Sequence, residues 1–552
     1  MSLSGPMNGR NALLALLQDE GVTHLFGNPG TTELALMEAL PAAPGLQYVL
    51  GLQESVVVAM ADGFARASGR LAACNLHCMP GLGHAMGALY NARFAGSPLI
   101  VTAGQYEIGH GLQEPMLYEP LVPVAQPLVK WAAEPQRLED LPRIVRRAAK
   151  IATTPPCGPV FLSLPGSILD AEADLDLGAP TRVEAHGLPA PRVQEALLRM
   201  LLASASPVII AGRELAEQGG MESAGELAQL LGAPVWQEPI PYNTRFPVRH
   251  PCAMGDLSRN QRKVREHLAG HDLLVVLGAD LLRMSVYSPV DPLPPGLRVV
   301  HISERDAELG KNYATELAVR AGVAETLAAL LPRLRAAQDE PLRQSARERL
   351  ARIAGANWSS RREALLAAAP AADPADAMQP LTLLRRLVDA LPAGAVCVEE
   401  APTTAPLLAS LLPMEGARDF LGLASGGLGF GMGGAVGAAL ARPGTPVVAL
   451  IGDGSAMYAI QALWTAAHHR LPITYVIVNN RSYRILKERM VSSRGSDSFI
   501  GMEFADPPLD FVALARGMGV PGQRVTQGDA LDRVLREAFA SGGPFLIDAA
   551  VA

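Results

Sequence analysis

Two polar turns near the C-terminus carry residue types that can bind a metal ion. Asp453 follows the apolar run 447–451, and Asn480, 27 residues later, follows the apolar run 473–478. Residues 456–469 between them are rich in alanine and predict a helix, while the two runs predict buried strands. A strand–helix–strand unit closes right-handed, so both turns are expected at the carboxyl ends of neighbouring parallel strands.

The chemistry that these turns suit is the binding of Mg²⁺ and a diphosphate. A carboxylate, an amide oxygen and a nearby carbonyl are oxygen ligands, and Mg²⁺ takes few of them before substrate phosphates and water complete its shell. A helix N-terminus beside them can bind phosphate. The alternative is an ordinary turn in which Asp453 only caps a helix. The second turn at this spacing favours the metal site.

Glu54 is a candidate acid. It stands where an expected strand passes into the segment 55–66, a helix of small residues that can pack closely against a neighbour. A glutamate at a helix start more often serves as a favourable charge near the N-terminal dipole. The catalytic interpretation therefore depends on other residues.

Length and composition limit the class of protein. The 552 residues predict about three domains. With 49% hydrophobic and 18% charged residues, the chain has the composition of a folded globular protein. A net charge of −7 without a basic run argues against nucleic-acid binding. Five scattered cysteines, an N-terminus unlike a signal peptide and no long apolar run predict a cytoplasmic protein without a membrane span.

The chain divides into three blocks, each with short apolar strands that alternate with helical patterns. We expect domains at 1–176, 192–338 and 378–552, separated by stretches rich in Pro, Gly and Ala. The pattern predicts an α/β fold of three doubly wound domains with mainly parallel sheets.

The polar turns resemble the cofactor signature of thiamine diphosphate (ThDP) enzymes, GDG followed by NN. Nearly the whole chain is similar to the benzoylformate decarboxylases among them. The likeness is carried by the segments 26–34, 75–77, 87–89, 98–105, 127–131, 249–252, 426–430 and 462–467. It implies pyrimidine-binding, middle and diphosphate-binding domains in that order. It also implies a homotetramer, a dimer of dimers, with active sites at dimer interfaces.

The resemblance assigns roles residue by residue. Asp453, Asn480 and the Ser482 carbonyl would bind Mg²⁺, and Glu54 would protonate the cofactor's aminopyrimidine. Thr31 would bind the substrate carboxylate and His77 would transfer protons, although a histidine satisfied at a strand end is the alternative. His84 is a possible neighbour. The remaining cofactor contacts implied are Thr403, Gly426, Leu428, Gly454, Ser455 and Tyr483.

The chain departs from the family at the substrate pocket. Ser285 stands where the decarboxylases have a second catalytic histidine, and a hydroxyl cannot shuttle protons near neutral pH. Gly422 and Arg489 fall where the family has bulky aromatic residues, with Ile485, Leu486 and Met116 around them. Arg489 and Lys487 are either solvated helix charges or ligands for a second anion.

Three hypotheses follow. The first is a ThDP- and Mg²⁺-dependent decarboxylase of 2-oxo acids, releasing CO₂ and an aldehyde. The second is a ThDP-dependent carboligase or lyase similar to acetolactate synthase, making or breaking 2-hydroxy ketones. FAD in the middle domain is disfavoured. The third is a nicotinamide-binding protein or a ThDP fold that has lost its site. The sequence has no suitable G-x-G-x-x-G for the former, and the latter leaves the presence of Glu54, Asp453 and Asn480 unexplained.

Overall fold

The computed structural model describes residues 4–184, 187–239, 242, 245–369, 373–414 and 418–552. It contains three six-stranded sheets, each with helices between successive strands. Contacts divide the chain into two compact units. The first holds residues 1–183, 372–405 and 421–552, and the second holds residues 184–371 and 406–420.

The first sheet belongs to the N-terminal part of the first unit. Its strands pair in parallel in the spatial order β3 (Gln47–Leu50), β2 (His24–Gly27), β4 (Ala72–Leu76), β5 (Leu99–Gln105), β7 (Val160–Pro165) and β6 (Ala132–Ala133). The helices are α1 (Gly9–Asp19), α2 (Leu34–Ala39), α3 (Glu54–Ser68), α4 (Cys78–Ala95), α5 (Leu121–Ala125), α6 (Leu141–Thr153) and α7 (Gly166–Asp170). Strands β1 (Ser4–Asn8) and β8 (Glu172–Asp176) form a separate antiparallel pair.

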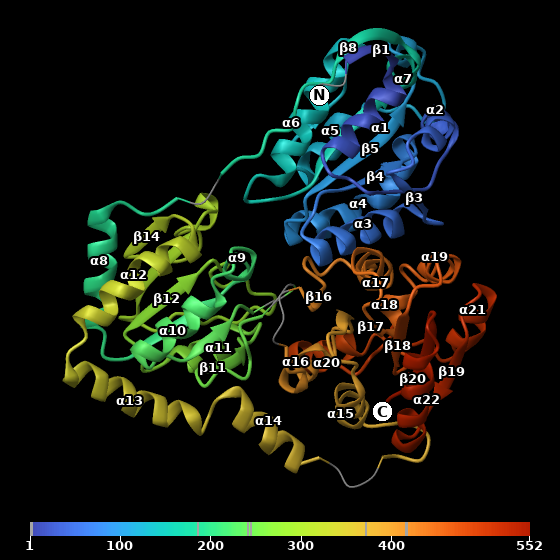
Figure 1. The fold of residues 1–552 in the computed structure, drawn as a ribbon. Coiled ribbons are helices and arrows are strands. Elements are labelled where there is room, and N and C mark those ends of the chain that lie inside the picture. The colour runs from blue at the N-terminus through green and yellow to red at the C-terminus, as the bar shows by residue number, and fades with distance from the viewer. Residues whose placement is uncertain (1–3, 185–186, 240–241, 243–244, 370–372, 415–417) are drawn as a thin grey trace. The chain divides into compact units, whose positions relative to one another are not determined.

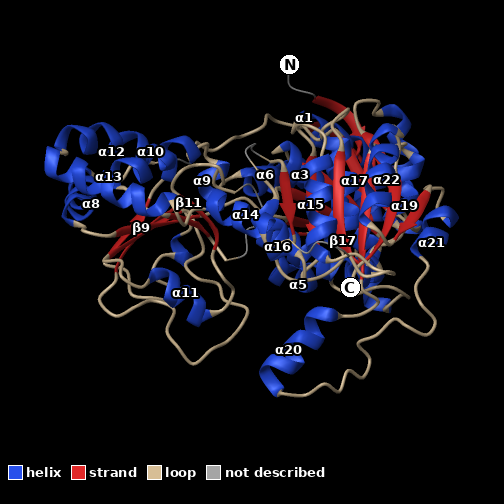
Figure 2. Cartoon of the chain, turned by 90° about the horizontal axis from the view of Figure 1, so that it is seen from below, coloured by secondary structure: helices blue, strands red, loops and turns tan. Residues whose placement is uncertain are grey.

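The C-terminal sheet of the same unit has the same character. Its order is β16 (Phe420–Gly422), β15 (Val396–Glu400), β17 (Val447–Gly452), β18 (Ile473–Asn479), β20 (Phe545–Ala550) and β19 (Gly522–Val525), and the strands from β15 to β19 pair in parallel. Its helices are α15 (Pro380–Ala390), α17 (Phe430–Ala441), α18 (Asp453–Ala456), α19 (Ala462–His468), α20 (Arg484–Arg494), α21 (Phe511–Gly517) and α22 (Gly528–Ala540). Figure 2 shows α20 standing away from this sheet.

Helix α3 packs directly on α17, which gives the two sheets of the first unit a common hydrophobic core (Figure 1). The approach depends on glycine. A Cβ on Gly63 would lie 2.2 Å from the Gly434 carbonyl oxygen, and a Cβ on Gly437 would lie 1.9 Å from the Met60 carbonyl oxygen. The expectation that the small residues of α3 allow close packing is confirmed.

The second unit contains the middle sheet. Its parallel order is β11 (Ala253–Asp256), β10 (Val235–Gln237), β9 (Pro207–Ala211), β12 (Leu273–Leu277), β13 (Arg298–Ser303) and β14 (Leu317–Arg320). Its helices are α8 (Pro191–Ala203), α9 (Arg213–Glu217), α10 (Met221–Leu231), α11 (Gln261–Leu268), α12 (Val323–Ala337), α13 (Glu340–Ala354), α14 (Trp358–Ala367) and α16 (Ala405–Leu411), whose residues after Ala405 belong to this unit. The α/β class with three mainly parallel sheets is confirmed, because all three sheets have this form.

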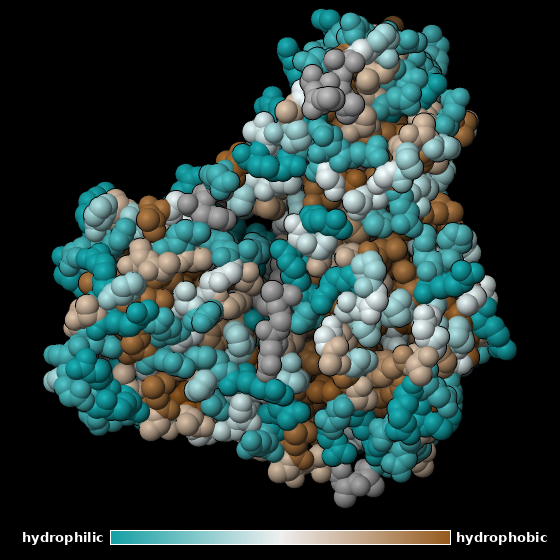
Figure 3. All heavy atoms as spheres, in the orientation of Figure 1, coloured by the Kyte–Doolittle hydropathy of each residue, from teal (hydrophilic) through white to brown (hydrophobic). Residues whose placement is uncertain are grey.

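The face seen in Figure 3 is mainly hydrophilic, with hydrophobic side chains in small groups. Among the helices of the described residues, none combines the length and the apolar character needed to cross a bilayer.

Candidate active site

The two polar turns meet at one edge of the C-terminal sheet. Strands β17 and β18 are parallel neighbours, with Gly452 opposite Val478, so the residues that follow them lie together. Asp453 Oδ2 accepts the backbone N–H of Asn480 at 3.0 Å and that of Ser482 at 3.3 Å. Asn480 Oδ1 in turn accepts the backbone N–H and the hydroxyl of Ser482. The expected convergence of the turns is thus present.

A pocket opens over this edge. It is lined by residues 401–404, 452–455 and 482–485 together with Leu428, Val478 and Asn480. It therefore gathers most of the residues for which the sequence predicted a role in binding cofactor or metal, namely Thr403, Leu428, Asp453, Gly454, Ser455, Asn480, Ser482 and Tyr483. Gly426 is not among its lining residues; it lies two residues before Leu428 in a left-handed turn with φ of 82°.

The pocket's chemistry suits a cation bound by oxygen atoms. Burial raises the pKa of Asp453, whereas backbone N–H groups that donate to its carboxylate act in the opposite direction. A divalent cation would stabilise the ionised form further. Gly454 leaves room for the Tyr483 ring, since a Cβ there would come within 2.6 Å of a ring carbon. The oxygen donors of Asp453 and Asn480 fit Mg²⁺.

The helix after Asp453 is shorter than the sequence predicted. One helix over 456–469 was expected, but α18 ends at Ala456 and α19 begins at Ala462. Between them, backbone N–H groups bond three residues back, as when Tyr458 donates to Ser455 and Ala459 to Ala456. These tighter turns replace α-helical bonds and leave Tyr458 half exposed. The prediction of a continuous helix was wrong.

Glu54 occupies the first position of α3, where the sequence placed it. Gln53 caps the helix, with its side-chain oxygen accepting the backbone N–H groups of Ser55 and Val56. The Glu54 carboxylate instead turns to other elements. Its Oε1 accepts from Asn28 Nδ2 at 3.2 Å, and its Oε2 lies 3.0 Å from His84 Nδ1. The glutamate therefore has specific partners on the loop after β2 and on α4.

His77 forms a second pair with a carboxylate. It is the N-cap of α4, and its Nδ1 lies 2.9 Å from Oε2 of the fully buried Glu33 and 3.1 Å from the Thr32 hydroxyl. Glu33 also accepts the backbone N–H groups of Gly30 and Gly104. With Nδ1 held in this way, Nε2 is the nitrogen that can exchange a proton with a ligand.

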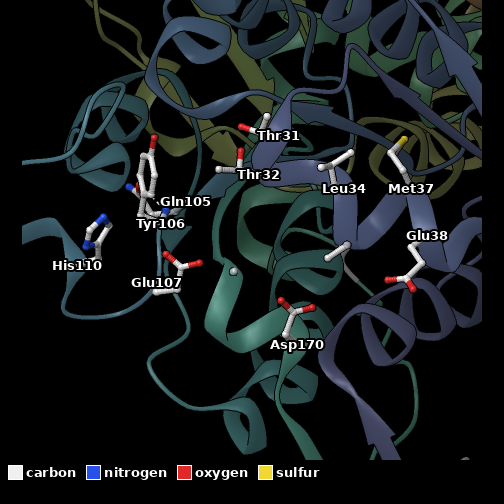
Figure 4. A pocket seen from close by; sticks show the side chains of 12 residues that line it. Thr31, Thr32, Leu34, Met37, Glu38, Gln105, Tyr106, Glu107, His110 and Asp170 are labelled. Carbon is white, nitrogen blue, oxygen red and sulfur yellow. Dashed lines mark hydrogen bonds between the residues drawn. The ribbon is translucent and has the colours of Figure 1, made fainter.

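Thr31 lies on the wall of another pocket of the N-terminal domain, with a volume of about 880 Å³ (Figure 4). Figure 4 shows Thr31 and Thr32 at one side of the hollow and Glu107 and Asp170 at another. The other residues around it are Leu34, Ala35, Met37, Glu38, Gln105, Tyr106, His110 and Gly166. Thr31 is exposed there, whereas Thr32 is engaged with His77 and Glu33.

Hydrogen bonds from α3 and α4 fix the strap 422–425, which leads into Gly426 and Leu428. Arg66 Nη2 donates to the Gly422 carbonyl at 2.9 Å. Asn91 Oδ1 accepts the backbone N–H groups of residues 424 and 425 at 3.0 and 3.1 Å, and Asn91 Nδ2 donates to Asp62. The N-terminal part thus orients the strap.

Another buried carboxyl group belongs to Glu400. Both oxygens of Glu400 accept backbone N–H groups at the start of α17, those of Gly429 and Gly431. Burial raises the pKa of Glu400 to about 8, against the effect of these hydrogen bonds.

Of the residues predicted to surround the substrate, Ile485 lines the pocket over Asp453, whereas Ser285, Arg489 and Met116 do not. Ser285 is exposed in the loop after β12, within the second unit. Arg489 is exposed on α20, whereas Lys487 pairs with Glu503 at 2.7 Å. Met116 is largely exposed in the loop before α5.

Sequence reasoning gave no role to three polar residues that shape these sites: Glu33, Asn91 and Glu400. For Glu33 and Glu400 a signal existed, because each is a charged residue next to a run of buried strand or glycine-rich sequence. For Asn91, inside the long helix α4, the sequence offers no comparable signal.

Comparison with known proteins adds three matched segments. Residues 7–117 match "Thiamine pyrophosphate enzyme, N-terminal TPP binding domain", residues 194–330 match the central domain, and residues 403–549 match the C-terminal TPP binding domain. The chain is 36% identical over 549 residues to benzoylformate decarboxylase of Pseudomonas aeruginosa, with 98% of both chains covered. The chain belongs to the thiamine pyrophosphate enzyme family.

Other members of the family are also similar. The putative acetolactate synthase large subunit IlvX of Mycobacterium tuberculosis is 32% identical, with 99% of both chains covered. The solved structure of 4-hydroxybenzoylformate decarboxylase from Rhodococcus jostii superimposes with a TM-score of 0.87 at 32% identity, again with 99% of both chains covered. The resemblance inferred from the sequence is confirmed, and the chain is a ThDP-dependent enzyme.

Proposed function

We propose that this protein is a ThDP- and Mg²⁺-dependent decarboxylase of 2-oxo acids that releases CO₂ and an aldehyde. The proposal rests on one observation: both parts of the first unit carry polar side chains that are suited to this chemistry. Glu54 and the Glu33–His77 pair lie on the N-terminal part, and the Asp453–Asn480 edge lies on the C-terminal part. Relatives named benzoylformate and 4-hydroxybenzoylformate decarboxylase support it.

Each residue has a defined task in this proposal. Bound ThDP would supply an electron sink for the electron pair that stays on the former keto carbon when CO₂ departs. Asp453, Asn480 and the Ser482 carbonyl would bind Mg²⁺, and Thr403, Gly454, Ser455 and Tyr483, which line the same pocket, would contact the diphosphate. Leu428 would contact the cofactor, and the Gly426 carbonyl would accept a hydrogen bond from its amino group.

On the N-terminal part, Glu54 would supply a proton to the aminopyrimidine ring of bound ThDP. Thr31 binds the substrate carboxylate through its hydroxyl. His77 moves protons at Nε2, because Glu33 and Thr32 engage its Nδ1. Ser285 replaces a second histidine, so His77 serves more than one proton transfer.

The assembly belongs to the proposal as well. The pocket around Asp453 is lined by residues of the C-terminal domain alone, and Glu54 bonds to Asn28 and His84 of the N-terminal domain. We propose that a second copy of the chain completes each active site, in a dimer of dimers, in the cytoplasm.

The test is CO₂ release from a panel of aromatic and aliphatic 2-oxo acids, with bound ThDP measured with and without Mg²⁺. Asp453→Asn is expected to lose cofactor and activity together, because it removes the charged ligand. Asp497→Asn, on an exposed loop, is the matched control and is expected to keep both. If none of the acids yields CO₂, the decarboxylase assignment fails.

A carboligase or lyase is the second candidate, favoured by Ser285 and by the acetolactate synthase relative. Without a second imidazole, proton return is slower, and a second carbonyl compound has more time to react. Product analysis separates the two functions. Free aldehyde alone supports decarboxylation, whereas a 2-hydroxy ketone as the main product supports carboligation.

Substrate preference is expected to differ from that of the named relatives. Gly422 is buried at a position where the family has an aromatic ring, and losing one ring contact costs roughly 1 kcal/mol of binding. Arg489 can bind a second carboxylate bidentately. Specificity constants should therefore favour a 2-oxo acid other than benzoylformate, with 2-oxo diacids the first to compare. A clear preference for benzoylformate would contradict this pocket assignment.

A further inference from the structure

The first turns of α4 present two histidines to two glutamates. His77 caps the helix and meets Glu33, and His84, two turns further on, meets Glu54 with Nδ1 and Oε2 separated by 3.0 Å. Gly81 lies between the two histidines, where an added Cβ would come 3.4 Å from Glu54 Cγ. The helix therefore lies directly against the glutamate.

The exposure of the two partners differs sharply. The His84 side chain is 62% exposed, whereas the Glu54 side chain is 11% exposed. Glu54 Oε1 is engaged by Asn28 Nδ2 at 3.2 Å, which leaves Oε2 and the imidazole facing each other. The almost buried carboxyl group is thus bonded to a ring that solvent can reach.

An imidazole nitrogen and a carboxyl oxygen at this distance share one hydrogen atom. An imidazolium N–H or a neutral imidazole Nδ1–H can donate to the carboxylate, or a carboxyl O–H can donate to a neutral ring nitrogen, and the heavy atoms take the same positions in all three cases. Only the first and the third of these states leave a proton on Glu54 when the ring departs as neutral imidazole. We propose that His84 is a positioning residue that stores the proton Glu54 needs when the aminopyrimidine ring of ThDP binds. The inference rests on the proposed function and deepens it.

The number of protons taken up when ThDP binds distinguishes the Glu54–His84 pair from an isolated glutamate. When the ring nitrogen of ThDP replaces His84 as the partner of Glu54, the stored proton stays with Glu54 and the neutral imidazole is released. No proton is taken from solution. Without His84, the Glu54 carboxylate must take up one proton from solution for the same contact.

Other titratable groups near this corner have partners of their own. Glu33 and His77 bond each other, and Cys78, whose thiol pKa is raised by burial, contacts the Thr32 hydroxyl. On β3, Tyr48 has a phenol pKa raised by burial and by the charge of Glu33. None of these bonds involves Glu54, so changing His84 leaves them intact.

The experiment is calorimetry of ThDP binding to the full-length protein with excess Mg²⁺ in buffers of different ionisation enthalpy. His84→Asn keeps an amide that can hydrogen-bond Glu54 but does not titrate. We expect proton uptake on binding to rise by up to about one proton in His84→Asn relative to wild type. Its Kd for ThDP should also rise more steeply with pH than that of wild type over the range in which the wild-type pair holds its proton, by up to about tenfold per pH unit.

Two controls isolate the Glu54–His84 pair. His77→Asn should show wild-type uptake, because its partner is Glu33. In a Glu54→Gln background, His84→Asn should add nothing, because no carboxyl group remains to be charged. His84→Gln serves as a second non-titrating variant if the asparagine variant folds poorly.

Equal uptake in wild type, His84→Asn and His84→Gln overturns the inference while ThDP binding still supports the proposed function. A wild-type protein that binds no ThDP overturns the proposed function, and the inference with it.

Discussion

The Glu33–His77 and Glu54–His84 pairs join the same residue types at nearly the same distance, 2.9 and 3.0 Å, in different surroundings. Glu33 is fully buried and takes two backbone N–H groups and the Thr32 hydroxyl in addition to the imidazole. Glu54 has only a side-chain amide beside its imidazole among the hydrogen bonds found in the described residues.

Glycine makes the close enclosure of the Glu33–His77 pair possible. A Cβ on Gly30 would lie 2.2 Å from His77 Nδ1, and a Cβ on Gly104 would lie 2.1 Å from Glu33 Oε1. The carboxylate of Glu33 is thus enclosed by backbone and fixes the orientation of His77. Glu54, at a helix start beside a largely exposed ring, remains able to change partners. The same pair of residue types thus fixes a ring where backbone encloses it and, in the role proposed for Glu54 and His84, stores a proton where the ring is exposed.

The largest expected effect comes from removing the exchangeable carboxyl group. Glu54→Gln keeps size and hydrogen-bonding capacity but cannot supply a proton. Turnover should fall by about 10²- to 10⁴-fold, the usual contribution of acid–base catalysis, with little change in the melting temperature. Steady-state kinetics and thermal unfolding measure the two quantities. Wild-type turnover in this variant would show that another carboxyl group performs the task.

Glu33→Gln should have a smaller effect on turnover and a larger one on stability. The orientation of His77 is loosened, which typically costs about 10- to 100-fold in activity for a carboxylate that orients a histidine. One buried backbone donor loses its acceptor, at about 1–3 kcal/mol of unfolding free energy. Kinetics and denaturant unfolding test both parts. Unchanged Kd for ThDP is expected, since Glu33 does not bond Glu54; a large change in Kd would show that the pairs are coupled.

Gly30→Ala tests the enclosure itself. The new methyl group would lie 2.2 Å from His77 Nδ1 and must displace the ring by about 1 Å, a misplacement that can lower turnover by up to about 10²-fold. Gly83→Ala, whose Cβ has its nearest neighbour at 4.0 Å, is the matched control and should retain activity. Equal turnover in the two variants would indicate that His77 tolerates displacement.

The smallest expected effect concerns Glu400, whose carboxyl group accepts hydrogen bonds from backbone N–H groups. Unlike Glu54, Glu400 transfers no proton in the proposed function. Burial raises its pKa to about 8, from about 4.3 in an unfolded chain. Between these values the folded state holds a proton that the unfolded state releases. Stability from this group is therefore complete below the unfolded pKa and is lost as the pH rises through the folded one.

Glu400→Gln stays neutral at every pH, so its melting temperature should fall less than that of wild type between about pH 5 and about pH 8. Scanning fluorimetry across this range measures the difference. Glu172→Gln, on an exposed strand position, should follow the wild-type curve. Parallel curves for wild type and Glu400→Gln would show that Glu400 is ionised in the folded protein.

Much of the fold follows from local pattern. Alternation of apolar runs with helical segments predicted three α/β blocks, because a strand buried on both faces needs a continuous apolar run. The edge formed by Asp453 and Asn480 was predictable for the same reason: neighbouring parallel strands end together. The break between α18 and α19 was not, because an alanine-rich segment is compatible with both α-helical and tighter turns.

The sequence by itself determined the residue types, the parallel sheets and the convergence of the polar turns, all of which depend on spacing along the chain. Only the tertiary structure decided which partner each polar side chain has. Glu33 meets His77 across 44 residues, Glu54 meets His84 across 30, and Asn91 meets the strap across more than 300. Such contacts depend on how helices pack over long separations, where glycine clearance and burial, rather than local periodicity, select the partner.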